Sequence, residues 1–138
     1  MIALDTNVLL RYLLQDDKAQ SPRAAKLLTG GDKVLITDVV MVETLWTLKG
    51  KKYKLTREDL IKVVDQLFRE PNIEFEDGQT VWRALSDFRT ALPPAEVDLA
   101  DTLILAKAQF DTGRKAEKFN GLYTFDVALQ YFTDTKKP

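Results

Sequence analysis

The chain is predicted to fold as an α/β protein with a parallel sheet that carries helices on both faces. Short runs of strand length alternate with longer helical stretches along all 138 residues. One of these runs, residues 34–37, is compact, apolar and rich in β-branched residues, which is typical of a buried parallel strand. Acidic residues stand at the ends of several apolar segments. In α/β sheets ligands bind outside the carboxyl ends of the strands, so these acids are candidates for a site.

The first half of the chain supplies three strands and four helices to this scheme. The predicted strands are residues 2–5, 34–37 and 73–75. The predicted helices are residues 8–14, about 21–28, 38–48 and about 56–69. Their starts are marked by capping residues or by an early proline, and Asp38 is expected to cap the third of them.

The second half continues the alternation. Helices are predicted at about residues 79–90, at 98–111 and at 127–132, with a last strand at 121–124. Residues 92–95 are predicted to form a stiff loop, because neither of their two prolines fits inside a helix. No linker or repeat divides the chain, so residues 1–138 are predicted to be one domain, with a frayed tail at 133–138.

Composition narrows the available chemistry. The chain has no histidine and no cysteine, which excludes imidazole bases, thiol nucleophiles and soft-metal sites and leaves oxygen-ligand chemistry. The net charge of -1 means that any contact with nucleic acid needs a local basic patch. The first residues do not resemble a signal peptide, and no apolar run approaches the ~18 residues of a membrane span. A soluble cytoplasmic protein is therefore expected.

Four carboxylates form the strongest functional signal. Each of them stands in or directly after an apolar segment: Asp5, Glu43, Asp101 and Asp126. A lone carboxylate in such a setting is costly unless it is paired or bound to a cation. Four gathered carboxylates would also repel one another. A shared cation is therefore expected, and Mg²⁺ or Mn²⁺ prefers oxygen ligands.

Each acid also has a plain structural explanation. Asp5 and Asp126 are suited to cap the helices that follow them, and Glu43 could simply face solvent. Asp101 could pair with a lysine or an arginine. On a helical wheel Asp101 falls on the apolar flank of its helix and Asp98 on the more polar flank. This predicts Asp101 as a ligand and Asp98 as a cap or an outer acid.

Taken together, the motifs resemble a known family. The residues that carry the resemblance are Leu4-Asp5-Thr6-Asn7-Val8-Leu9, Glu43-Thr44-Leu45, Asp98-Leu99-Ala100-Asp101-Thr102-Leu103-Ile104 and Thr124-Phe125-Asp126. In order and over nearly the whole chain they resemble the PIN-domain family and, within it, the VapC toxins of bacterial toxin–antitoxin modules. The resemblance implies a three-layer α/β/α fold with a central parallel sheet of four to five short strands.

The resemblance also implies a metal-dependent endoribonuclease. Asp5, Glu43 and Asp101 would bind Mg²⁺ or Mn²⁺, and Asp126 would complete the acidic site. Four further residues would support these ligands: Thr6, Asn7, Asp98 and Thr124. The reaction would be hydrolysis of an RNA phosphodiester by water, leaving a 5′-phosphate and a 3′-hydroxyl, with no nucleophile from the protein.

RNA must approach an acidic pocket, so flanking cations are expected. The candidates are Lys49, Lys51, Lys52, Lys54 and Arg57, with Tyr53 among them in the sequence. Arg11 and Arg23, near the first strand, are also candidates, and both could equally contact an antitoxin. Tyr53 could stack on a base. A solvated loop is the plain alternative for residues 49–54.

The resemblance further implies a homodimer that is inhibited by a small VapB-like antitoxin. Apolar residues of the early helices and of the helix at 56–69 are candidates for that contact: Leu10, Leu13, Leu14, Leu60, Val63, Val64 and Leu67. Core packing is the alternative explanation for each of them.

Other functional classes compete with this hypothesis. A non-catalytic PIN-like module that binds RNA or protein would be favoured by the loss of one acid, but all four are present. A phosphatase of the haloacid dehalogenase type needs Asp-x-Asp where this chain has Asp5-Thr6-Asn7. A dinucleotide-binding domain is excluded because no Gly-x-Gly-x-x-Gly follows the first strand.

Overall fold

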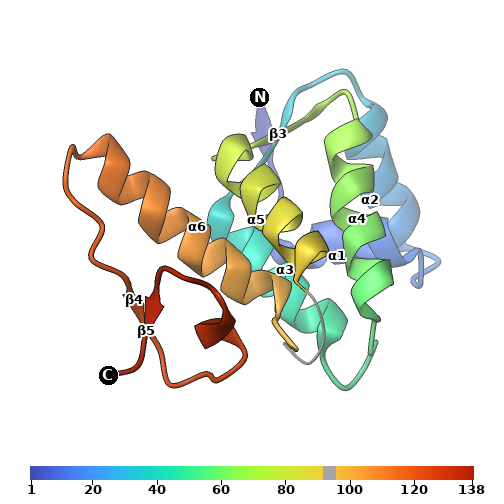
Figure 1. Cartoon of the computed structure of the whole chain (residues 1–138). Helices are drawn as coiled ribbons and strands as arrows, with labels where there is room; N and C mark the ends of the chain where they lie inside the picture. Colours follow the sequence, from blue (N-terminus) through green and yellow to red (C-terminus); the bar gives the residue numbers. More distant parts are fainter. Residues whose placement is uncertain (92–95) are drawn as a thin grey trace. The chain divides into compact units, whose positions relative to one another are not determined.

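The computed structural model describes residues 1–91 and 96–138 (Figure 1). The chain divides into two compact units, Met1–Gly78 (unit 1) and Gln79–Pro138 (unit 2). The predicted stiff loop at 92–95 lies outside the described residues. That residues 1–138 act as one domain stays a prediction.

Unit 1 combines a parallel sheet with four helices. Its strands are β1 (Ile2–Ala3), β2 (Val34–Ile36) and β3 (Ile73–Phe75). Its helices are α1 (Thr6–Leu14), α2 (Gln20–Thr29), α3 (Asp38–Lys49) and α4 (Arg57–Arg69). The central strand is β2, in which Val34 is paired with Ile2 of β1 and Ile73 of β3. A pair of helices connects each strand to the next, as parallel pairing requires, and the predicted α/β class is confirmed.

Short polar side chains set the starts of α1 and α3. The Asp5 carboxylate accepts a hydrogen bond from the Val8 amide at 3.0 Å, and Thr37 Oγ1 accepts one from the Val40 amide at 3.4 Å. The sequence names Asp38 as the cap of α3, but the cap is one residue earlier. The extended backbone at Thr37 lets its hydroxyl reach the amide three residues on, so Asp38 becomes the first helical residue.

Apolar side chains of unit 1 are buried along the strands and along one face of each helix. They include several of the residues that were predicted to contact a partner protein. Leu10, Leu60, Val64 and Leu67 are buried, while Leu13, Leu14 and Val63 are half-buried. Core packing therefore explains the four buried residues, because the apolar stripe of an amphipathic helix is most stable facing the protein interior.

Unit 2 is mostly helical. Its elements are α5 (Gly78–Thr90), α6 (Leu99–Arg114), β4 (Leu122–Tyr123), a short 3₁₀ helix η1 (Leu129–Tyr131) and β5 (Thr135–Lys136). The two strands pair in parallel, Leu122 with Thr135 and Tyr123 with Lys136. The helix predicted at 127–132 is therefore only one 3₁₀ turn.

The C-terminal tail differs from the prediction. The sequence predicts that residues 133–138 fray, whereas part of this segment forms β5. Backbone hydrogen bonds hold it: the Leu122 amide donates to Asp134 at 2.8 Å and the Thr124 amide to Lys136 at 2.9 Å. The tail is polar, so it carries no apolar pattern that would indicate a strand. The five strands of the described residues thus form a three-stranded and a two-stranded sheet instead of one sheet.

Within the described residues, no helix is both long and apolar enough to span a bilayer.

Candidate active site

Asp5 and Glu43 line one pocket of unit 1. The pocket has a volume of about 410 Å³ and is also lined by Thr6, Asn7, Leu10 and Val40. Asp5 follows β1, and Glu43 lies in the second turn of α3, which follows β2. Because β1 and β2 are parallel neighbours, both elements leave the same edge of the sheet. The two acids thus line one pocket, and their role as metal ligands stays a prediction.

Hydrogen bonds fix one oxygen of each carboxylate in this pocket. Thr6 Oγ1 donates to Glu43 Oε1, and Asp5 Oδ1 accepts from the Val8 amide. Neither Asp5 Oδ2 nor Glu43 Oε2 has a hydrogen bond or an ion pair within residues 1–91 and 96–138. Asp5 therefore caps α1 through Oδ1, as its structural explanation predicted. Its other oxygen, Oδ2, stays free. An all-oxygen donor set of this kind fits Mg²⁺ or Mn²⁺.

In unit 2, Asp98 and Asp101 stand at the start of α6. Asp98 is its cap and accepts a hydrogen bond from the Ala100 amide at 3.4 Å, as predicted. Asp101 lies in the first turn and is half-buried. The helix dipole favours an anion there by about 0.3–1 kcal/mol.

Asp126 organises the turn before η1. Its carboxylate accepts hydrogen bonds from the Ala128 amide at 2.9 Å and the Leu129 amide at 3.5 Å. Its own amide donates to Thr124 Oγ1 at 3.0 Å, and a supporting role of Thr124 at a metal site stays a prediction. Asp126 therefore caps two backbone amides of this turn, although Ala128, and not Asp126 as predicted, is the N-cap residue of η1. The Asp126 side chain is exposed.

In the predicted metal site, two of the four carboxylates come from unit 1 and two from unit 2. Within either unit, over its described residues, no three acidic side chains gather closely enough to hold a metal ion. A site with Asp5 and Glu43 from unit 1 and with Asp101 and Asp126 from unit 2 stays a prediction about both units together.

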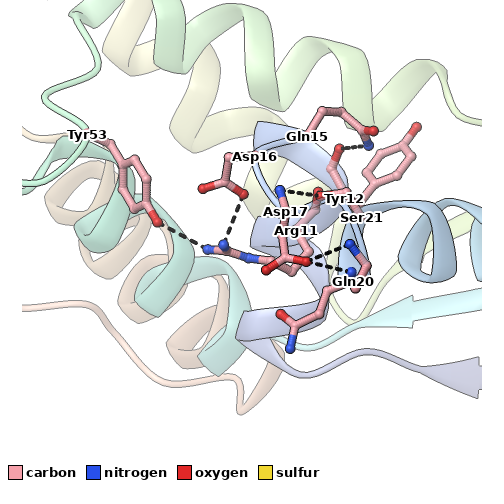
Figure 2. Close-up of polar contacts among 9 residues, drawn as sticks. Arg11, Tyr12, Gln15, Asp16, Asp17, Gln20, Ser21 and Tyr53 are labelled. Carbon is pink, nitrogen blue, oxygen red and sulfur yellow. Dashed lines mark hydrogen bonds and ion pairs between the residues drawn. The ribbon is translucent and has the colours of Figure 1, made fainter.

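Arg11 and Tyr53, two predicted RNA contacts, bind each other (Figure 2). Arg11 donates to the Tyr53 hydroxyl at 3.1 Å and forms an ion pair with Asp16 at 2.9 Å. The hydrogen bond from Arg11 lowers the pKa of Tyr53, and the same bond raises the pKa of Arg11. The Arg11 side chain is only 14% exposed. Arg11 is therefore a structural link between α1 and the loop at 50–56 and is not available as a free cation.

The lysines of the loop at 50–56 have exposed side chains. Lys51, Lys52 and Lys54 are exposed, and the ammonium of Lys52 lies 5.2 Å from the centre of the Tyr53 ring. Lys54 has a left-handed backbone with φ of 51°, and the Leu55 amide donates to the Leu48 carbonyl at 2.9 Å. These contacts hold the loop against the end of α3. Lys49 and Arg57 flank it on the two helices.

Two exposed aromatic residues precede Asp126, and neither was predicted as a site residue. Tyr123 is 61% exposed and Phe125 is 80% exposed. Only Tyr123 lies in β4, so strand alternation could not have revealed both residues. Lys136 Nζ lies 6.0 Å from the centre of the Tyr123 ring. One aromatic and one cationic side chain thus lie together on the small sheet of unit 2.

The fold and the pocket lined by Asp5 and Glu43 define an α/β protein with acidic side chains at the carboxyl edge of a parallel sheet. The family model for the PIN domain matches residues 2–132, so the chain belongs to the PIN-domain family. PIN domains are generally nuclease modules, which supports a hydrolase of phosphodiester bonds, and PIN nucleases typically use divalent metal ions. A comparison with curated proteins found no match to this chain.

Proposed function

We propose that this protein is a metal-dependent endoribonuclease whose site is formed by Asp5, Glu43, Asp101 and Asp126. The observation that carries the proposal is the pocket of unit 1. Two carboxylates there each present a free oxygen, at the sheet edge where α/β proteins bind ligands, in a chain of a generally nucleolytic family.

The donor atoms suit the proposed cation. Asp5 and Glu43 would hold Mg²⁺ or Mn²⁺ through their free oxygens, and Asp101 and Asp126 would add charge from unit 2. The bound ion supplies positive charge for the phosphate and an activated water. This chemistry needs no nucleophile from the protein, which agrees with a chain that has no histidine and no cysteine.

The remaining residues position these groups and the RNA. The Thr6 hydroxyl holds Glu43 in one orientation, and the first turn of α1 holds Asp5. Exposed lysines at 51, 52 and 54 are the cations that would contact the RNA backbone. Fixed carboxylates do not have to reorganise during the reaction, and this preorganisation lowers its barrier.

We also propose that the enzyme is the toxin of a toxin–antitoxin pair that blocks translation. The support is the order and spacing of the acidic motifs over nearly the whole chain, which resemble the VapC toxins. A small VapB-like antitoxin would cover the acidic pocket with a basic side chain, and the enzyme would act in the cytoplasm as a homodimer.

A non-catalytic PIN-like binding module is the second candidate, and one observation favours it. Asp5, Asp98 and Asp126 all cap backbone amides, so each has a structural use that a module without activity would also need. Asparagine caps helices about as well as aspartate. Substitution with asparagine therefore removes the charge and keeps the cap, which separates the two candidates.

The test is cleavage of RNA in Mg²⁺ or Mn²⁺ by wild type, Asp5→Asn and Asp101→Asn. We expect each variant to lose at least ~100-fold in rate, because a ligand charge is removed from the metal site. Asp32→Asn in unit 1 and Glu117→Gln in unit 2 are matched controls, since both side chains are exposed and make no side-chain contact with the described residues. Both controls should cleave like wild type.

Other outcomes would reject the proposal. RNA binding without metal-dependent cleavage by wild type would favour the binding module. Unchanged cleavage in both acidic variants would reject the assigned ligands. Cleavage that persists in EDTA would show that the activity does not come from a metal site.

A further inference from the structure

A second pocket of unit 1, with a volume of about 330 Å³, is formed by α1 and α2. The α2 side is lined by residues at i, i+3, i+4 and i+7, which share one face of a helix. These residues are Gln20, Arg23, Ala24 and Leu27. The α1 side is lined by Asn7, Val8 and Arg11.

The pocket carries polar groups that the fold does not use. The amides of Asn7 and Gln20 and the guanidinium of Arg23 make no side-chain hydrogen bond or ion pair with the described residues. Arg23 and Gln20 are exposed. Arg11 also lines the pocket, but its guanidinium is already paired with Asp16 and Tyr53. One free cation and two free amides suit a ligand with negative charge and several hydrogen-bonding groups.

The rest of the pocket is apolar. Val8 and Ala24 contribute to its lining, and Leu27 is 43% exposed. Small-molecule pockets typically combine apolar walls with a few placed polar groups, and their volumes begin at about 300 Å³. A ligand with a flat apolar ring and a phosphate group fits these apolar walls and polar groups better than a phosphate ion alone.

Contacts in the α1–α2 turn hold the two walls together (Figure 2). Asp17 accepts hydrogen bonds from the amides of Ala19 at 2.9 Å and Gln20 at 2.7 Å. The buried Ser21 hydroxyl donates to the Arg11 carbonyl at 2.8 Å. The pocket is therefore preformed, which reduces the entropy cost of binding.

This pocket adjoins the acidic one. Asn7 lines both, so the first turn of α1 is their shared wall.

We infer that the α1–α2 pocket binds a nucleotide adjoining the scissile phosphate of single-stranded RNA, an inference that rests on the proposed function. Arg23 pairs with the phosphate of this nucleotide, and the base lies against Val8 and Leu27. The amides of Asn7 and Gln20 bind the base edge or the ribose hydroxyl. Only an unpaired base can enter, because bases in an RNA duplex are stacked and paired.

The test measures binding of a short labelled single-stranded RNA by fluorescence anisotropy, with Ca²⁺ in place of Mg²⁺ to prevent cleavage. Arg23→Gln should weaken binding about tenfold and lower the salt dependence of binding by about one ion. Lys26→Gln is the matched control, since it removes one exposed charge from the same helix outside the pocket. This control should stay within about twofold of wild type. Leu27→Ala should weaken binding with no change in salt dependence, and thermal melts establish that each variant is folded.

Three results would overturn the inference. In the first, wild type cleaves RNA, and Arg23→Gln binds RNA with the same affinity and salt dependence as Lys26→Gln. This result rejects the pocket as an RNA-binding site and does not affect the proposed function. The second is that Arg23→Gln loses binding of a co-expressed antitoxin but keeps its affinity for RNA, which makes the pocket a protein interface. The third is an equal effect on duplex RNA, which rejects the single-stranded ligand. If wild type neither binds nor cleaves RNA, the proposed function itself fails.

Discussion

The acids of the two units stand in similar sequence contexts but differ in what the local structure does with them. In unit 1, Asp5 follows β1 and Glu43 lies in the helix after its parallel neighbour β2, and both line one pocket. In unit 2, Asp98 and Asp126 satisfy backbone amides at the start of α6 and η1. Asp5 lines the pocket and also caps a helix, because one of its oxygens caps α1 while the other stays free.

This difference shows how structural and catalytic explanations of an acid can both hold. A carboxylate has two oxygens, and a helix cap uses only one of them. Capping also orients the carboxylate, which favours its use as a ligand. The predictions below separate the two roles, from the largest expected effect to the smallest.

The largest effect is expected at Asp5, which caps α1 and is also a proposed ligand. Asp5→Asn and Asp5→Ala should both lower metal-dependent cleavage at least ~100-fold. Only Asp5→Ala should lower the free energy of unfolding, by about 1 kcal/mol, because alanine cannot cap α1. Rate assays and urea melts measure the two quantities. Equal destabilisation by both substitutions would mean that the charge, and not the cap, stabilises this region.

Removal of Arg11 should mainly affect stability. Arg11→Met leaves Asp16 and Tyr53 without their half-buried partner, so the free energy of unfolding should fall by about 1–3 kcal/mol. Arg23→Met, on the neighbouring helix and exposed, should change it by less than about 0.5 kcal/mol. If Arg11→Met instead weakened RNA binding with no loss of stability, Arg11 would be a direct contact.

Thr6→Val tests whether the orientation of Glu43 matters. This substitution removes the hydroxyl that donates to Glu43 and keeps the shape of the side chain. Loss of such a supporting group typically costs about tenfold or more in metal affinity. Calorimetric titration with Mn²⁺ should therefore show weaker binding, and Thr6→Ser should restore it. Equal affinities in all three proteins would show that Thr6 does not position a ligand.

Asp126→Asn tests the exposed acid of unit 2. The amide keeps the hydrogen bonds from Ala128 and Leu129, so the melting temperature should not change. Cleavage should fall about tenfold, less than at Asp5, because an exposed charge is screened by solvent. An unchanged rate would limit Asp126 to its capping role.

The smallest effect concerns Tyr12 at alkaline pH. Burial, followed by its hydrogen bond to Glu70 at 2.8 Å, raises the pKa of Tyr12 to about 12. The folded state holds this proton more tightly than the unfolded chain does. The contribution to stability is therefore complete below about pH 10 and is lost as the pH rises towards 12. Urea melts across this range should show that Tyr12→Phe flattens the decline; an equal slope in both proteins would contradict the assignment.

The sequence predicted the regular parts of the fold well, because these depend on local signals. Capping residues and apolar periodicity located α1 to α6 and the three strands of unit 1. The small sheet of unit 2 was not predicted, because β5 is polar and is held by backbone hydrogen bonds. Short-range patterns carry little information about such pairing.

The candidate site was predicted in part. The position of acids after apolar runs identified Asp5 and Glu43 before their shared pocket was seen. The link between Arg11 and Tyr53 was missed, because the two residues are 42 positions apart and each looked like an RNA contact. The α1–α2 pocket was missed because its lining combines two short helical faces with unremarkable residues.

The central claim is that carboxylates from both units bind one divalent ion. The most direct measurement is an anomalous diffraction map of crystals of the protein soaked with Mn²⁺. We predict one strong peak bound by oxygens of Asp5, Glu43 and Asp101, at about 2.0–2.2 Å from each. A peak bound by residues of one unit alone, or Asp5 and Asp101 on separate faces of the molecule, would contradict the account.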